Sequence, residues 1–262
     1  MTTQRQEDLL QAFLTTITTE SDVISVFLSG SLARGTGDDL SDIDLTVITK
    51  NGRGDAWFSS LQPTVEGISK VLLPIRTDTA KRCAVFVFDD LVEMTVTVLE
   101  ESEVKPSPAY SEIKPLHDPL GLSSTLKSKS SLLPKKARIE ALIATESLFL
   151  WGTLAVRKRL LRDNVWDARD ALEKLRYLVI RLMNLRDAKL DGYKNIEKTL
   201  DAKSIILLSK TASGYDKDAV LSALAACFDF FVRTRDEVFA QFDIKPNETA
   251  TNKVSQTLNS FR

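Results

Sequence analysis

The sequence predicts an α+β protein in two parts, and two observations carry this prediction. Short apolar, β-branched runs alternate with amphipathic segments in the first 130 residues. After residue 134 the apolar residues recur at helical spacing, and no strand pattern follows. We therefore expect a mixed sheet with helices over residues 1–130, of which 102–130 form a connector rich in proline and serine, and an all-helical bundle over 131–262.

Each expected element rests on a local pattern. Helical spacing of apolar residues predicts helices over 4–18 and 55–69, with Asp55 as the N-cap of the second. Short apolar or alternating runs predict strands over 23–28, 43–49, 81–88 and 91–99, and an edge strand over 113–118. Longer helical periodicity predicts helices near 135–162, 166–188, 194–209 and 216–242.

Composition excludes several classes of protein. The 262 residues are 43% hydrophobic with a net charge of −1, which argues against a dedicated nucleic-acid binder. Cys83 and Cys227 lack the spacing of a metal or redox motif, so we expect a reduced, cytoplasmic protein. From the polar start and the short apolar runs we expect neither a signal peptide nor a membrane span. His117 is the single histidine, which excludes a multi-histidine metal site.

The most informative stretch runs from residue 23 to 49. An apolar strand ends at the pair Gly30-Ser31, with Arg34 just beyond, and a second strand begins around Asp42 and Asp44. Glycine lets the backbone approach a ligand closely, and the serine hydroxyl can donate to a phosphate oxygen. Asp42 and Asp44 point to one face of the strand, where they repel each other unless a cation such as Mg²⁺ lies between them. The stretch therefore predicts a phosphate cradle beside a metal-binding carboxylate pair.

This constellation resembles the DNA polymerase β-like nucleotidyltransferase superfamily. The matching residues are Gly30, Ser31, Asp42 and Asp44, with a spacer of the family's length between the two pairs. The resemblance implies that the serine turn holds the triphosphate of ATP or another nucleotide, with Arg34 adding charge. It also implies that the two aspartates hold Mg²⁺, and that the N-terminal part has the polymerase β-like fold.

The family places a third carboxylate on a neighbouring strand. Our candidate is Glu93, on the polar face of the strand predicted over 91–99. If the register differs by two residues, the position is instead occupied by Thr95 and the chain lacks this acid.

Glu146 lies on the inward stripe of the first C-terminal helix, where a lone carboxylate needs a partner or a solvated cleft. One reading is a buried pair with Arg176 or Arg181. The other is a general base, because the run Glu146 to Phe149 resembles a helix that supplies the base in antibiotic nucleotidyltransferases of the kanamycin type.

These expectations combine into one functional hypothesis. The chain transfers a nucleoside monophosphate, with ATP as the leading donor, onto a hydroxyl of a small molecule, and the resemblance favours aminoglycoside or lincosamide antibiotics as acceptors. One alternative is AMPylation of a protein, as in minimal antitoxin-type nucleotidyltransferases. Another is a non-catalytic nucleotide-binding module. The resemblance is also compatible with a homodimer that completes the cleft, but the sequence does not determine the oligomeric state.

Overall fold

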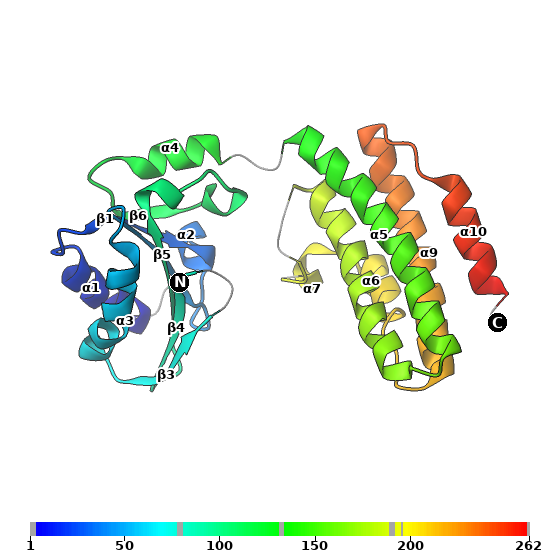
Figure 1. Cartoon of the computed structure of the whole chain (residues 1–262), viewed down its shortest axis with the longest axis horizontal. Helices are drawn as coiled ribbons and strands as arrows, with labels where there is room; N and C mark the ends of the chain where they lie inside the picture. The colour runs from blue at the N-terminus through cyan, green and yellow to red at the C-terminus, as the bar shows by residue number, and fades with distance from the viewer. Residues whose placement is uncertain (1–3, 78–80, 131–133, 189–191, 195, 261–262) are drawn as a thin grey trace. The chain divides into compact units, whose positions relative to one another are not determined.

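The computed structural model describes residues 4–77, 81–130, 134–188, 192–194 and 196–260. The chain divides into two compact units, residues 1–132 and 133–262 (Figure 1). The α+β fold class predicted from the sequence is confirmed. The first unit contains a mixed sheet, and the second unit contains helices.

The first unit is built on a six-stranded sheet in the order β3-β4-β5-β2-β1-β6. Only the β2·β5 pair is parallel among the strand pairs of the described residues. The strands are β1 (Val23–Ser29), β2 (Ile43–Thr49), β3 (Val71–Arg76), β4 (Cys83–Phe88), β5 (Glu93–Glu100) and β6 (Lys114–His117). The helices of this unit are α1 (Gln4–Ile17), α2 (Gly30–Arg34), α3 (Gly54–Ile68) and α4 (Leu122–Lys129), with short 3₁₀ turns over Glu101–Glu103 and Pro108–Tyr110.

The two faces of this sheet have different covers. Helices α1 and α3 lie over one face and bury a large apolar cluster that includes Phe13, Val26, Leu45 and Val96 (Figure 1). The other face carries a smaller cluster, in which Leu126 of α4 meets Phe27 and Ile48. Because side chains alternate along a strand, Asp44 shares this second face with Phe27 and Ile48 but lies near the opposite end of β2.

Several elements of the first unit were missed or misplaced by the sequence analysis. The predicted connector contains α4, and β6 pairs with β1, so 102–130 is part of the folded unit. Strand β3 was not predicted. It contains Pro74, whose missing N–H donor is tolerated because β3 lies at the edge of the sheet.

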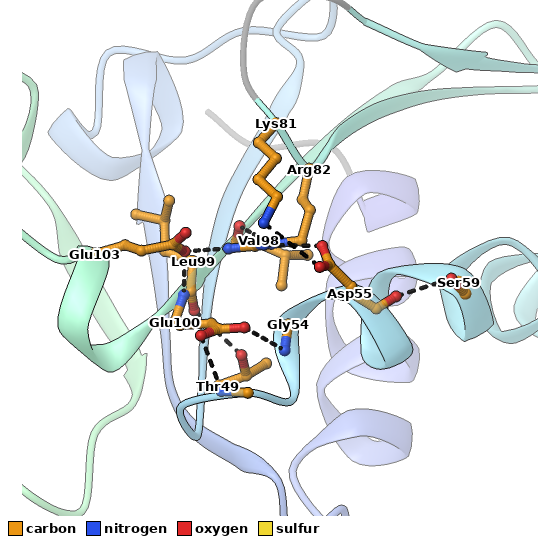
Figure 2. A network of polar contacts seen from close by, with 11 residues as sticks. Thr49, Gly54, Asp55, Ser59, Lys81, Arg82, Val98, Leu99, Glu100 and Glu103 are labelled. Carbon is orange, nitrogen blue, oxygen red and sulfur yellow. Dashed lines mark hydrogen bonds and ion pairs between the residues drawn. The ribbon is translucent and has the colours of Figure 1, made fainter.

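Asp55 does not cap α3, whose N-cap is Arg53. It pairs instead with Arg82, whose side chain is 2% exposed and also donates to Glu103 and to the Val98 carbonyl (Figure 2). Glu100 accepts the backbone N–H groups of Gly52 at 2.9 Å and Gly54 at 3.1 Å. This network fastens the end of β2 and β5 that lies away from Asp44.

The second unit is a helical bundle built on α5 (Lys135–Leu161), α6 (Val165–Arg186) and α9 (Lys217–Phe242). Shorter helices complete it: α7 (Ile196–Thr199), α8 (Ala202–Ser209) and α10 (Glu248–Asn259). The helix predicted over 194–209 is divided into α7 and α8, and its residue 195 lies outside the described residues. Helix α10, which packs on α5, was not predicted.

The bundle has a continuous apolar core in which the rings of Phe149 and Phe231 stack with centroids 3.6 Å apart. Helix α5 is long and apolar enough, by length and composition, to cross a membrane, which the sequence analysis did not anticipate. Of its most apolar window, 39% is buried inside the structure, against α6 and α9.

Candidate active site

The glycine turn at the end of β1 brings a backbone bend and a carboxylate together. Gly30 has a φ of +71°, a left-handed conformation that favours glycine, and it begins the short helix α2. Gly35, also at φ +71°, ends that helix. The chain therefore makes a tight turn between two glycines, directly after a buried strand.

Asp44 lies against this turn. Strands β1 and β2 are antiparallel, and Asp44 is the cross-strand partner of Ser29, the residue before Gly30. The Ser29 hydroxyl donates to the Asp44 carbonyl at 3.3 Å. A Cβ atom on residue 30 would lie 2.3 Å from Oδ2 of Asp44, far inside van der Waals contact. Glycine at this position therefore leaves the room that the Asp44 carboxylate occupies.

Asp42 precedes β2 and is exposed. It lies two residues before Asp44, so the alternation of an extended chain turns both side chains to the same face of the sheet. The donor set is two carboxylates beside backbone and hydroxyl groups, which matches the oxygen ligands that Mg²⁺ prefers. The residues present therefore fit a magnesium site.

Ser31 and Arg34 follow on α2. Within the described part of the chain, the hydrogen bonds of Ser31 involve its carbonyl, which accepts the N–H of Thr36 at 3.0 Å. Arg34 Nη1 lies 3.7 Å from Glu112 Oε2 in an exposed ion pair. Exposed pairs of this kind contribute little to stability, so the guanidinium is available to a competing anion.

The register of β5 bears on the third carboxylate. Thr95 is the direct neighbour of Asp44 in the parallel β2·β5 pair, and Ile43 is opposite Met94. Glu93 is the first residue of β5, exposed, and shares the face of Thr95. Among the described residues, no three His, Cys, Asp or Glu side chains form a group that could hold a metal. The third-ligand role of Glu93 stays a prediction.

Glu146 has a buried environment in the second unit. Its Oε1 accepts hydrogen bonds from Nη1 of Arg235 at 2.9 Å and from the backbone N–H of Asn247 at 3.0 Å. The side chains of Glu146 and Arg235 are 5% and 1% exposed. The buried pair was therefore predicted with the wrong partner, because Arg176 bonds to Glu173 and Thr211 instead. Arg235 is 89 positions away in sequence, and no local pattern marks it.

A comparison with protein families gave a match within the first unit. A sequence model of the nucleotidyltransferase domain matches residues 10–130. The chain is therefore similar to this domain over slightly less than half of its length. This similarity supports a transferase of the nucleotidyltransferase type.

Solved structures that are similar to this chain share little sequence with it. An aminoglycoside 6-adenyltransferase from Bacillus subtilis is 13% identical with a TM-score of 0.47, covering 97% of this chain and 96% of that one. A spectinomycin adenyltransferase from Enterococcus faecialis, solved with ATP and spectinomycin, is 12% identical with a TM-score of 0.40, covering 88% and 99%. At such similarity neither protein indicates a substrate for this chain. A search of curated protein sequences gave no match.

Proposed function

We propose that this enzyme transfers AMP from ATP to a hydroxyl group of a small molecule, with Mg²⁺ held by Asp42 and Asp44. The observation that carries the proposal is the close approach of the Asp44 carboxylate to Gly30, where residue 30 has no room for a Cβ atom. A carboxylate pair directly beside a glycine turn supplies both a metal site and a phosphate site within one small region.

Each residue of the turn has a task in this reaction. Gly30 lets the backbone approach the β- and γ-phosphates, and the Ser31 hydroxyl donates a hydrogen bond to a phosphate oxygen. Arg34 leaves its exposed partner and adds positive charge. Bound Mg²⁺ supplies charge neutralisation as pyrophosphate leaves.

The proposal treats the two other predicted acidic residues, Glu93 and Glu146, differently. Thr95 and not Glu93 is the direct neighbour of Asp44, so Glu93 stays in the proposal only as a third metal ligand that reaches the site from two residues away on the same sheet face. Glu146 is left out as the base, because its Oε1 already accepts two hydrogen bonds in a buried ion pair. A general base accepts a proton, and protonation of Glu146 would remove the buried negative charge that pairs with Arg235.

We propose an aminoglycoside or lincosamide as the acceptor. The support is the layout of the chain, a nucleotidyltransferase domain followed by a helical unit, together with the resemblance noted in the sequence. Acceptor choice depends on the shape of the acceptor site, so the experiment must test a panel of compounds.

The test is a pyrophosphate-release assay with Mg²⁺, each nucleoside triphosphate and a panel of both antibiotic classes, followed by mass spectrometry of the products. We expect one compound to gain the mass of AMP. Asp44→Asn should abolish release, whereas Asp39→Asn, an equal charge change at an exposed position of the same loop, should not.

Three other results would contradict parts of the proposal. Transfer of AMP to a protein instead of to an antibiotic would show that the proposed acceptor is wrong. Nucleotide binding without pyrophosphate release from any mixture would indicate a binding module. Normal turnover of Asp44→Asn would remove the metal assignment.

A further inference from the structure

Helix α1 carries a buried amide on its apolar face. Gln6 is 1% exposed and occupies the stripe that continues through Leu9, Leu10 and Phe13 into the core. Burying an amide side chain without hydrogen-bond partners is destabilising, so a buried glutamine is expected to form hydrogen bonds with the groups around it.

The Gln6 side chain binds the loop that precedes the two aspartates. Its Nε2 atom donates to the carbonyl of Asp38 at 3.1 Å and to the carbonyl of Ser41 at 2.6 Å. These two carbonyls lie 32 and 35 positions away in sequence and bracket the loop on both sides. The Ser41 carbonyl belongs to the peptide group that joins Ser41 to Asp42. Because this group is planar, the direction of the Ser41 carbonyl also fixes the position of the Asp42 backbone nitrogen.

The loop is also closed from within. The Asp38 carboxylate accepts the N–H of Leu40 at 3.2 Å and the hydroxyl of Ser41 at 2.9 Å. The N–H of Asp38 donates to the Ser41 hydroxyl at 3.0 Å, and the N–H of Ser41 donates to the Asp38 carbonyl. The loop is therefore a compact turn that Gln6 holds as one piece.

The two predicted metal ligands thus have separate supports. Asp44 is inside β2 and rests against Gly30. Asp42 lies outside the strand, and its preceding peptide is fixed by Gln6. Groups that orient metal ligands without touching the metal commonly decide metal affinity.

We propose that Gln6 is a positioning residue, which sets the orientation of Asp42 for a divalent cation through the loop 38–41. The inference rests on the proposed function, because it takes Asp42 and Asp44 as the metal ligands. Without the Gln6 amide, the loop 38–41 loses these two hydrogen bonds, and the Asp42 side chain is no longer held in position beside that of Asp44.

The test replaces Gln6 with Met, which has nearly the same shape but cannot donate. Binding of Mn²⁺ alone is measured by electron paramagnetic resonance on the full chain, so that activity is not the readout. We expect Gln6→Met to bind Mn²⁺ about 10–100-fold more weakly. Amide hydrogen exchange at Leu40 and Ser41 should become faster.

Two further variants keep the test decisive. Leu14→Ala is the matched control, because Leu14 lies on the same apolar face of α1 but makes its contacts in the large core cluster. It should lower thermal stability and leave Mn²⁺ binding unchanged. Ser41→Ala opens the turn from inside without altering α1, so it carries the test if Gln6→Met does not fold. We expect it to weaken Mn²⁺ binding as well.

Asp44→Asn separates the two possible failures. If it binds Mn²⁺ as the unaltered protein does, the metal site is wrong and the inference fails with it. If it loses binding while Gln6→Met keeps its affinity within about two-fold, a change too small for an orienting group, the metal site stands and the positioning role is overturned. Equal weakening by Leu14→Ala and Gln6→Met also overturns it, since general loosening of α1 then explains both.

Discussion

Alanine at Gly30 is the substitution that probes the candidate site most selectively. The new Cβ atom would lie 2.3 Å from Oδ2 of Asp44, whereas ordinary contact begins near 3.4 Å, so the carboxylate must move by about 1 Å. Misplacing a reacting or metal-binding group by this distance can reduce turnover about 100-fold. The left-handed backbone adds a stability loss of about 1–2 kcal/mol for any residue with a Cβ atom.

Gly35→Ala is the matched control for this prediction. Gly35 has the same φ of +71°, but a Cβ atom there meets nothing within 4 Å. Both variants should therefore lose similar stability in a thermal melt, while only Gly30→Ala loses activity. The assay compares kcat for pyrophosphate release and the melting temperature of both variants. Equal activity in the two variants would refute the idea that Asp44 must keep its place beside the turn.

Three further predictions concern other parts of the molecule. Glu146→Gln should destabilise the helical unit by about 1–3 kcal/mol, because Arg235 loses its buried carboxylate partner but keeps its ion pairs with Asp236 and Glu248, while kcat per folded molecule stays near normal. The N–H groups of Gly52 and Gly54 hold the pKa of Glu100 below its ordinary value of 4.5, so the stability this carboxylate contributes is present above that pH and is lost as the pH falls through the lowered folded-state pKa. Thermal melts should show this acid loss in the unaltered chain and less of it in Glu100→Gln. Burial raises the pKa of the Cys227 thiol to about 12, so a thiol reagent should not label it in the native protein at pH 8, where only a thiolate reacts.

Each of these predictions has its own contradiction. A Glu146→Gln protein with unchanged melting temperature and abolished turnover would restore the base role of that residue. An identical acid response in Glu100→Gln would remove Glu100 as the group responsible. Rapid labelling of Cys227 in folded protein would show that its surroundings open to solvent.

Much of the fold follows from local pattern, and the exceptions have physical causes. The long helices α5, α6 and α9 repeat apolar residues over many turns, so their existence was readily predicted. Strand β3 was missed because it lies at the sheet edge, where its apolar residues Leu72, Leu73 and Ile75 stay half exposed and do not alternate clearly. Helix α10 did carry a signal, since Thr251, Val254 and Leu258 are buried at helical spacing and Asn247 caps the helix.

Some residues of the candidate site could likewise be predicted from local sequence, whereas others depend on tertiary contacts. The turn and the two aspartates are local in sequence, so Gly30 and Asp44 could be predicted together. The alternation of β5 predicts which face its residues share but not their register, so only the structure shows that Thr95, and not Glu93, is the direct neighbour of Asp44. The roles of Gln6 and Arg235 arise only from tertiary contacts, because their partners are distant along the chain.

The most direct test of the central claim is product analysis with ATP, Mg²⁺ and the antibiotic panel for the unaltered chain, Asp44→Asn and Asp39→Asn. The account predicts one AMP added per pyrophosphate released by the unaltered chain and by Asp39→Asn, and neither product from Asp44→Asn. Full activity of Asp44→Asn, or no pyrophosphate from the unaltered chain with any acceptor, would contradict it.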